Sequence, residues 1–150
     1  MSLDSNVLID AVDRADRRHP RAVELLARAA HADCVLSIQS LAEFYHVVTR
    51  KGLAPRNEAT AQVEDMLTSF TTRAHDAAAL RAAIGIVTEH RIGFWDAMLC
   101  ATVQGAGCEV LLSEDLQDGR ALGGLHIVDP FDPSNDRLVD LVLPRLEVGP

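Results

Sequence analysis

Leu3-Asp4-Ser5-Asn6-Val7-Leu8-Ile9 opens the chain with a carboxylate, two short polar side chains and an apolar run. A carboxylate so close to a chain end usually frays into water. Here the apolar run is hydrophobic enough to be buried, so we expect it to hold Asp4 in a fixed place. A fixed carboxylate beside the oxygens of Ser5 and Asn6 is a hard, oxygen-rich corner of the kind that suits Mg²⁺ or Mn²⁺.

Length and composition bound the class of protein. The 150 residues, 48% of them hydrophobic, are enough for one domain with a sizeable core. No apolar run approaches the roughly 18 residues of a membrane span. The start carries carboxylates where a signal peptide would carry basic residues, so we expect no signal peptide and no membrane.

The cysteines indicate a reducing compartment. They are odd in number, lie in apolar runs and form no Cys-x-x-Cys pair, so we interpret them as core thiols of a cytoplasmic protein. They are Cys34, Cys100 and Cys108. The six histidines show no metal-ligand spacing, which argues against a zinc site.

The formal net charge of −8 argues against binding nucleic acid by bulk electrostatics. It leaves room for a nuclease whose acidic pocket holds cations and whose few basic side chains line the rim. Basic side chains cluster twice, and either cluster is a solvated helix face or such a rim. The clusters are Arg14, Arg17, Arg18, His19 and Arg21, and then Arg50, Lys51 and Arg56.

Apolar patterning predicts strands that alternate with helices. We expect strands at residues 1–3, 34–37, 71–75, 108–112 and 126–128. We expect helices at residues 20–30, 39–50, 55–70, 77–90 and 94–104, and one or two helical turns at 138–143. This alternation is typical of an α/β domain with a mostly parallel sheet, whose strands are unbroken apolar runs.

Two candidate carboxylates come directly after predicted strands. Asp4 follows the first strand, and Asp115 lies in the polar loop after residues 108–112. The carboxyl ends of parallel strands meet at one edge of a sheet, where α/β proteins usually bind ligands. Asp115 can also be an ordinary turn aspartate. Asp118 lies in the same loop as a fifth carboxylate, and Asp10 is interpreted as closing the first helical turn.

Two further candidates lie on predicted helices. Glu43 belongs to the polar stripe of its helix, where a solvated glutamate is the simple interpretation. Asp96 is the one charge on a helix that we expect to be apolar all round and buried, so it needs a partner or a metal ion, unless the helix dipole alone stabilises it. Carboxylates gathered at one place repel one another, so such a cluster is expected chiefly around divalent cations. These cations can activate a water and neutralise charge on a phosphate.

The order of these motifs resembles the PIN-domain ribonucleases, in particular the VapC toxins of bacterial type II toxin–antitoxin pairs. The opening stretch is similar to the family's Asp-Thr/Ser-Asn-Val-Leu-Ile signature. The other similar stretches are Ser37-Ile38-Gln39-Ser40-Leu41-Ala42-Glu43-Phe44, Phe94-Trp95-Asp96-Ala97, Leu112-Ser113-Glu114-Asp115-Leu116-Gln117-Asp118-Gly119 and His126-Ile127-Val128-Asp129-Pro130-Phe131.

The resemblance implies a PIN-like α/β/α sandwich over residues 1–131, with a mostly parallel central sheet flanked by helices, followed by a C-terminal extension over 132–150. It implies a metal-dependent endoribonuclease that uses Mg²⁺ or Mn²⁺, acts as a toxin, and is blocked by a cognate VapB-like antitoxin. We also expect a homodimer. The first strand is shorter than is usual in the family, which predicts a true start upstream of Met1.

The resemblance also implies roles for individual residues. The catalytic set is Asp4, Glu43, Asp96 and Asp115, of which Asp4, Asp96 and Asp115 would bind the metal. The auxiliary residues would be Ser5, Asn6, Ser113 and Asp118. The RNA rim would comprise Arg14, Arg17, Arg18, Arg50, Lys51 and Arg56.

Two other functions remain open at this point. One is a non-catalytic PIN-like module that binds RNA or protein. The other is a receiver-type phosphotransfer domain, which needs a lysine near the last strands, whereas the chain has a single lysine, Lys51.

An apolar stripe on the helix over residues 39–50 offers a place for the antitoxin. It consists of Leu41, Phe44, Tyr45 and Val48, and it is either a groove for the partner or ordinary core. In the first case a basic side chain of the antitoxin, most simply an arginine, would reach the carboxylates. The acidic net charge would help to steer such a basic segment.

Overall fold

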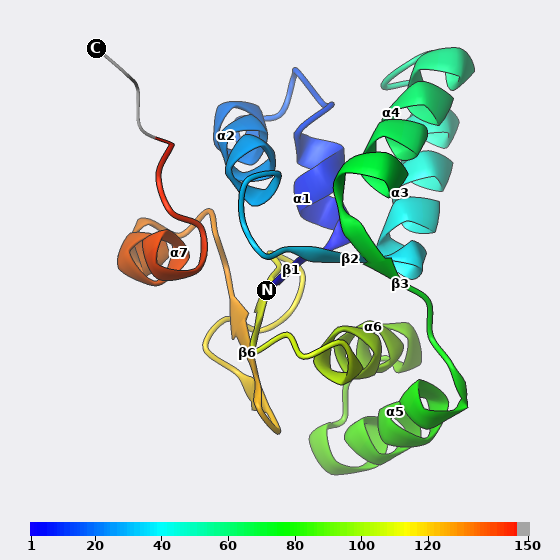
Figure 1. The fold of residues 1–150 in the computed structure, drawn as a ribbon, viewed down its shortest axis with the longest axis vertical. Helices are drawn as coiled ribbons and strands as arrows, with labels where there is room; N and C mark the ends of the chain where they lie inside the picture. Colours follow the sequence, from blue (N-terminus) through cyan, green and yellow to red (C-terminus); the bar gives the residue numbers. More distant parts are fainter. Residues whose placement is uncertain (147–150) are drawn as a thin grey trace.

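A central sheet lies between two layers of helices in the computed structural model, which describes residues 1–146 (Figure 1). The strands are β1 (Ser2–Leu3), β2 (Val35–Ser37), β3 (Thr71–Arg73), β4 (Val110–Leu112), β5 (Ala121–Leu122) and β6 (Leu125–Val128). The helices are α1 (Ser5–Asp10), α2 (His19–Ala29), α3 (Ile38–Lys51), α4 (Arg56–Ser69), α5 (Ala77–His90), α6 (Phe94–Gly105) and α7 (Asp136–Val142), with a 3₁₀ turn at Pro133–Asn135.

The sheet is mostly parallel, as the sequence predicts. Its main part has the strand order β1-β4-β6-β5, and β2 and β3 form a second pair. The two parts adjoin, because the Val35 N–H donates to the Met1 carbonyl oxygen over 2.9 Å. Among the strands within residues 1–146, β5 alone runs antiparallel to its neighbour. The sequence did not predict β5, because two residues are too few to show an alternation of apolar and polar side chains. A Gly-Gly turn with Gly123 at φ 62° joins β5 to β6.

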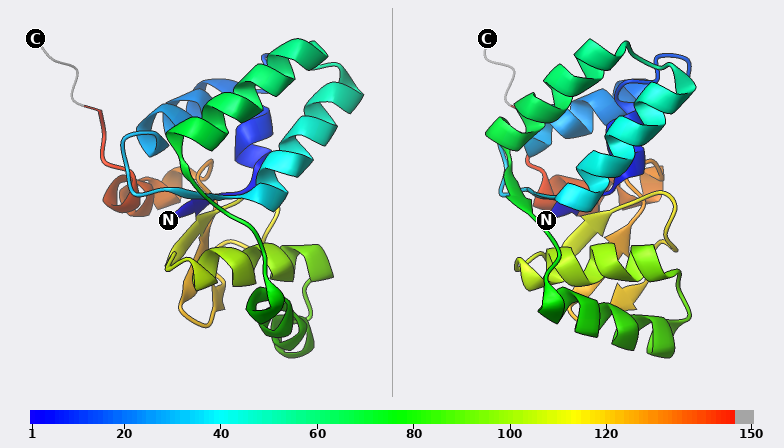
Figure 2. Two further views of the ribbon diagram at one scale, coloured as in Figure 1. Left: turned by 45° about the vertical axis from the view of Figure 1, so that its right-hand side comes forward. Right: turned by 90° about the vertical axis from the view of Figure 1, so that its right-hand side faces the viewer.

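Neighbouring side chains of β2, β4 and β6 enter different cores, so this part of the sheet is buried on both faces. Leu111 and Ile127 face α6, whereas Leu3, Leu112 and Val128 pack toward the other helical layer. Figure 2 shows α1, α2, α3 and α4 on one side of the sheet and α5 and α6 on the other. The three-layer α/β/α sandwich that we expected is confirmed.

The predicted helices and strands occur within a few residues of their expected bounds. The helix α6, however, is not buried along its whole length as expected. Ala97 to Val103 are buried, as expected of an apolar helix. Its first turn is not, because Phe94, Trp95 and Asp96 are exposed. The physical reason is that only the middle and end of α6 lie between the sheet and α5, where small residues such as Ala83 and Ala97 allow close packing. Asp96 therefore meets solvent on one side.

The C-terminal extension packs on the domain as far as the structure describes it. Val139 in α7 and Leu143 just after it are fully buried in the core beneath α2. Arg28 of α2, only 2% exposed, donates to Asp140 over 2.7 Å and to the Leu143 carbonyl oxygen. The helical turns predicted at 138–143 thus correspond to α7, whereas residues 147–150 lie outside the described residues. Within 1–146, no helix is long and apolar enough to cross a membrane.

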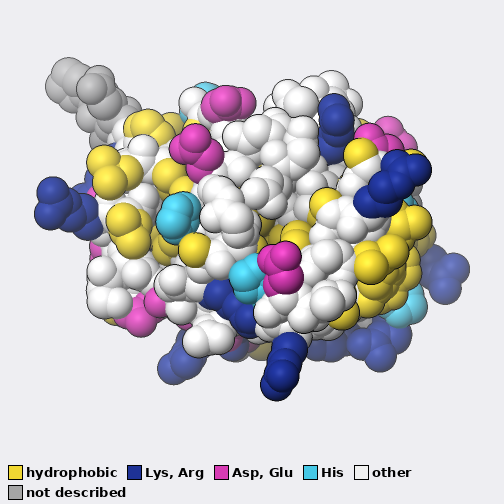
Figure 3. Space-filling view, turned by 90° about the horizontal axis from the view of Figure 1, so that it is seen from below, with side chains coloured by type: hydrophobic (Ala, Val, Ile, Leu, Met, Phe, Trp, Pro, Cys, Tyr) yellow, Lys and Arg dark blue, Asp and Glu magenta, His cyan; other side chains and the backbone are white. Residues whose placement is uncertain are grey.

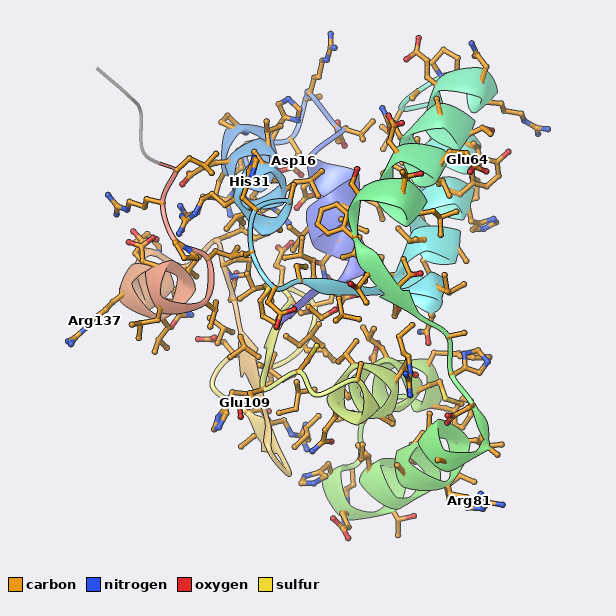
Figure 4. The ribbon with its side chains drawn as sticks, viewed as in Figure 1. Asp16, His31, Glu64, Arg81, Glu109 and Arg137 are labelled. Carbon is orange, nitrogen blue, oxygen red and sulfur yellow. The ribbon has the colours of Figure 1, made fainter. Side chains whose placement is uncertain are left out.

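Replacing Arg28 by Ala should lower the free energy of unfolding by about 1–3 kcal/mol, because it removes the donor to Asp140 Oδ1 and to the buried Leu143 carbonyl oxygen. Urea unfolding followed by circular dichroism measures the change. The control is Arg137→Ala, which removes the same charge from an exposed position of α7 (Figure 4). Equal stability of the two variants would show that Arg28 does not anchor the extension.

Candidate active site

Asp4 lies where β1 ends and α1 begins. Its N–H continues the parallel ladder by donating to the Leu112 carbonyl oxygen over 2.9 Å. Its extended backbone and its side chain then cap α1, with the Ser5 N–H donating to Oδ1 over 2.6 Å. This double role fixes the carboxylate at the carboxyl edge of the sheet. The apolar run after it is buried at Val7 and Leu8, as expected, and Asp4 itself is 5% exposed.

Two of the predicted auxiliary residues, Asn6 and Ser113, connect the neighbouring strand ends. The Ser113 hydroxyl donates to Asp4 Oδ2 over 2.7 Å. The Asn6 amide lies 3.3 Å from both Asp4 Oδ2 and the Ser113 hydroxyl. The Asn6 side-chain oxygen accepts from the Glu114 N–H over 3.4 Å. The loop that bears Asp115 is therefore attached to the start of α1 by side-chain hydrogen bonds.

Glu43 belongs to the same network rather than to a purely solvated helix face. The Ser5 hydroxyl donates to one of its carboxylate oxygens over 2.8 Å, and the Gln39 amide donates to the other over 3.0 Å. Gln39 also approaches the first turn of α6, where it donates to the Trp95 carbonyl oxygen over 2.9 Å. Sequence reasoning did not single out Gln39, although its spacing of four residues from Glu43 on one helix face was a usable signal.

The four predicted carboxylates act on one another electrostatically. Burial raises the pKa of Asp4 from 3.8 to about 6; hydrogen bonds from Ser113 and Ser5 oppose this, while the charges of Glu43 and Asp115 add to it. Desolvation likewise raises the pKa of Asp96, again with contributions from Glu43 and Asp115. Asp4 at the end of β1, Glu43 of α3, Asp96 of α6 and Asp115 of the β4–β5 loop thus share one acidic site, which we call the carboxylate cluster.

A second buried carboxylate, Asp10, lies close to Asp115 of this cluster. It is 8% exposed, its Oδ2 accepts no hydrogen bond from residues 1–146, and the nearest Arg18 nitrogen is 3.6 Å away. Burial raises its pKa to about 6 in spite of Arg18, and Asp16, Glu114 and Asp115 raise it further. The sequence suggested only that Asp10 closes a helical turn, because the spacing along the chain does not reveal its burial.

Only some of the basic side chains predicted to form the RNA rim lie near the carboxylate cluster with their charge uncompensated. Arg18 is bound by Glu114, Asp10 and Asp16, so its charge is largely compensated. Arg14 and Arg17 are exposed in the same α1–α2 region. The remaining three side chains belong to the far end of α3 and the start of α4, and the end of α3 lies roughly 12 Å along the helix axis from Glu43 at 1.5 Å per residue. They are Arg50, Lys51 and Arg56.

The structure differs from the sequence-based expectations for Asp118 and for the apolar stripe on α3. Asp118 does not join the carboxylate cluster through its hydrogen bonds; it accepts from the Asp129 N–H over 2.8 Å and from the Asn135 amide over 2.9 Å, which fixes the loop to the end of β6. The apolar stripe on α3 is ordinary core and offers no groove: its other members are buried and Tyr45 alone is exposed. The buried members are Leu41, Phe44 and Val48, at 3%, 1% and 0% exposure.

The carboxylate cluster has the donor chemistry of a site for Mg²⁺ or Mn²⁺. Its side chains offer carboxylate and hydroxyl oxygens, the ligands that hard divalent cations prefer. Among residues 1–146 no three Asp, Glu, His or Cys side chains stand close enough to hold a metal ion as they are placed. Burial raises the pKa of Asp4, and the charges of Glu43 and Asp115 raise it further; a bound cation would stabilise the charged carboxylate against both effects.

The fold and this arrangement define a three-layer α/β protein with an acidic candidate metal site at the carboxyl edge of its sheet. The family model of the PIN domain matches residues 1–117, and the chain belongs to the PIN-domain family. No curated protein matches the chain in sequence.

Solved structures similar to this chain include toxins of toxin–antitoxin systems. A toxin–antitoxin complex from Klebsiella pneumoniae has a TM-score of 0.65 and 20% identity, over 87% of this chain and 97% of that one. The sarcin–ricin loop cleaving toxin VapC20 of Mycobacterium tuberculosis has a TM-score of 0.62 and 18% identity, over 76% and 90%. VapBC2 of Rickettsia felis, bound to a fragment of its promoter DNA, has a TM-score of 0.61 and 16% identity, over 84% and 95%. At identities this low, the structural similarity establishes a shared fold and nothing more.

Replacing Asp4 by Asn should stabilise the protein in EDTA at pH 7 and above. The pKa of Asp4 is about 6 in the folded protein, against an ordinary value of 3.8. The charged form of Asp4 is therefore less stable in the folded than in the unfolded state and opposes folding. This penalty is absent below about pH 4, grows between about pH 4 and 6, and is complete above it. The pKa difference corresponds to about 3 kcal/mol, of which we expect about 1–2 kcal/mol to remain after weaker hydrogen bonding by the amide.

The free energy of unfolding, measured in urea from pH 4 to pH 8, tests this expectation. Asp33→Asn is the matched control, since Asp33 is exposed on the loop before β2. A gain for Asp4→Asn that is equal at pH 4 and pH 8 would contradict the assignment of a buried, repelled carboxylate.

Proposed function

We propose that the chain is a metal-dependent endoribonuclease that acts as the toxin of a toxin–antitoxin pair. The observation that carries this proposal is the carboxylate cluster, in which Asp4, Glu43, Asp96 and Asp115 from four separate elements influence one another. The similarity to VapC20, VapBC2 and the Klebsiella toxin–antitoxin complex supports the role as a toxin. A protein that attacks cellular RNA works in the cytoplasm, which agrees with three unpaired, buried cysteines.

Each carboxylate has a separate task in this proposal. Asp4, Asp96 and Asp115 would hold Mg²⁺ or Mn²⁺, with Ser113 and Asn6 keeping Asp4 in its orientation. The cation would lower the pKa of a water molecule and neutralise charge on the scissile phosphate. Glu43, fixed by Ser5 and Gln39, would orient the attacking water and accept its proton.

RNA with an accessible single-stranded loop is the substrate that we favour over duplex DNA. A chain with a net charge of −8 binds a duplex poorly by charge alone, so recognition depends on shape and a few contacts. Arg14 and Arg17 are the rim arginines that we assign to phosphate contacts, because both are exposed and neither forms an ion pair within residues 1–146.

Asp4→Asn and Asp96→Asn should each abolish RNA cleavage while the protein stays folded, because each change is nearly isosteric and removes a metal-binding oxygen. Sequencing RNA ends after brief expression measures cleavage in cells, and purified protein with Mg²⁺, Mn²⁺ or EDTA measures it in solution. Added Mn²⁺ should raise the melting temperature of the wild-type protein but not that of either variant.

The control for these assays is Asp33→Asn, which should cleave like the wild type. Full activity of Asp4→Asn, or of the wild type in excess EDTA, contradicts the proposed chemistry. A folded wild-type protein that neither binds metal nor cleaves RNA would instead be a non-catalytic PIN-like module.

The partner that we propose is a small antitoxin with a basic segment, since a toxic nuclease must be blocked and the carboxylate cluster attracts cations. The stripe on α3 is not available to it, but an apolar groove of about 370 Å³ lies open between α2 and α4. This α2–α4 groove is lined by Val23 and Leu26 on one side and by Met66 and Phe70 on the other. Val23 is 44% exposed there, so the groove has apolar surface to bury.

A second copy of the chain is the other partner that we propose. Figure 3 shows hydrophobic side chains gathered at the right of the view, over α5. Leu80 and Ile84 of α5 are 42% and 54% exposed, and Phe94 and Trp95 of α6 are 40% and 58% exposed. We infer that this face joins two protomers, and light scattering on the isolated protein should give twice the monomer mass.

Val23→Asp should weaken the antitoxin complex, because it places a charge in the α2–α4 groove. The antitoxin is expected from the small open reading frame beside the gene, and co-purification and growth after co-expression measure binding and rescue. Leu141→Asp, at a 72% exposed position of α7, is the matched control. Toxicity that the neighbouring product does not relieve, together with no complex, would contradict the antitoxin proposal and leave the nuclease proposal standing.

A further inference from the structure

A cavity of about 210 Å³ opens beside the carboxylate cluster, between the first turn of α6 and the loop from β4 to β5. Asp96 and Asp115, two of the proposed metal ligands, form part of its wall. Gly93 lines the cavity next to them, and a side chain there would first meet Asp96 Oδ2, at 3.4 Å from its Cβ. The cavity therefore adjoins the place where the proposed reaction would occur.

The floor of this cavity is apolar. Ile92 and Leu116 are half-buried and keep part of their apolar surface exposed, whereas Leu122 and Ile127 of the β5–β6 hairpin also line the cavity but are only 2% and 1% exposed. The exposed apolar surface of Ile92 and Leu116 suits the face of a planar ring, because packing on it removes apolar area from water. Water and inorganic ions gain nothing from such a floor.

One guanidinium group, that of Arg120, also lines the cavity. Arg120 is half-buried, donates to the His90 carbonyl oxygen, and forms no ion pair with any residue of the described part. It is thus held in place while its charge stays uncompensated, in contrast to Arg18, which three carboxylates surround. A fixed, unpaired arginine is suited to a phosphate or to the polar edge of a base.

Gln117 adds an amide to the same wall and is exposed. Its side chain carries both a donor and an acceptor, as the polar edge of a nucleobase does. The cavity thus combines an apolar floor, an amide, a cation and two carboxylates. A phosphate alone would use only the cation, and an apolar side chain would use only the floor.

We propose that this cavity binds the nucleoside next to the cleaved bond of the RNA, with its base on Ile92 and Leu116, its polar edge at Gln117, and its phosphate at Arg120. The proposal rests on the ribonuclease function proposed above and adds a base-specific subsite to it. Neither Gln117 nor Arg120 takes part in bond cleavage; both bind the substrate. Base preference at one position beside the cut follows from Gln117.

Purified variants and a pool of single-stranded RNA with randomised sequence test the subsite. Arg120→Ala should raise KM by roughly tenfold with little change in kcat, as expected for loss of one charge-assisted hydrogen bond that is made before and during the reaction. Arg120→Lys should recover part of that loss. Gln117→Glu should alter the base found at one position beside the cut when product ends are sequenced, because it exchanges an amide donor for an acceptor.

Arg137→Ala is the charge-matched control, since Arg137 projects from α7 on another side of the molecule (Figure 4). The chain's single tryptophan gives a second readout: Trp95 directly precedes Asp96, so its fluorescence should change when a non-cleaving Asp4→Asn protein binds the RNA pool. An additional Arg120→Ala change should shift that titration to roughly tenfold higher RNA concentration.

The outcomes separate the two proposals. Wild-type KM and wild-type base preference in both Arg120→Ala and Gln117→Glu overturn the subsite while the ribonuclease function stands. Loss of antitoxin binding with unchanged RNA cleavage also overturns it, and assigns the cavity to the protein partner. A folded wild-type protein that cleaves no RNA overturns the ribonuclease function itself.

Discussion

The parallel pairing of β1 with β4 is the constraint on which the rest of the site depends. Leu3 lies opposite Leu112, and the Asp4 N–H extends the ladder by one hydrogen bond to the Leu112 carbonyl oxygen. This register places Asp4 beside Ser113 at the same edge of the sheet. A slip of one residue would turn Leu3 and Leu112 away from their core and separate the two strand ends. The position of the carboxylate is therefore set by the buried leucines behind it.

The apolar core opposes the repulsion that the carboxylate cluster introduces. Burial raises the pKa of both Asp4 and Asp10 to about 6, so each is charged at neutral pH against an unfavourable environment. The two apolar layers on the faces of the sheet supply the stability that tolerates this cost. A functional site that destabilises its own fold is a common compromise in proteins, and it explains why we expect Asp4→Asn to be both more stable and inactive.

Two arginines of the α1–α2 region compensate buried charge in different ways. Arg18 joins Asp10, Asp16 and Glu114, and so stabilises carboxylates at the edge of the site. Arg28 is fully covered and attaches α7 to α2 through Asp140. Neither is free to bind phosphate as it is placed, whereas Arg120 is held by a carbonyl group alone and keeps its charge available. Where an arginine lies in the fold, rather than its place in a basic run, decides its role.

The sequence by itself determined the alternation of strands and helices, the parallel sheet, and the meeting of Asp4 with the loop of Asp115, because unbroken apolar runs and strand ends are local features. Glu43 came from resemblance alone, since a helix face that looks solvated gives no sign of the Ser5 hydroxyl that reaches it. Only the tertiary structure decided that the stripe on α3 is core, that Asp10 is buried, and that the cavity at Arg120 exists. All three features depend on contacts between side chains that are distant in the sequence. Such contacts leave no sign in the hydrophobic periodicity or in the spacing of residues along the chain.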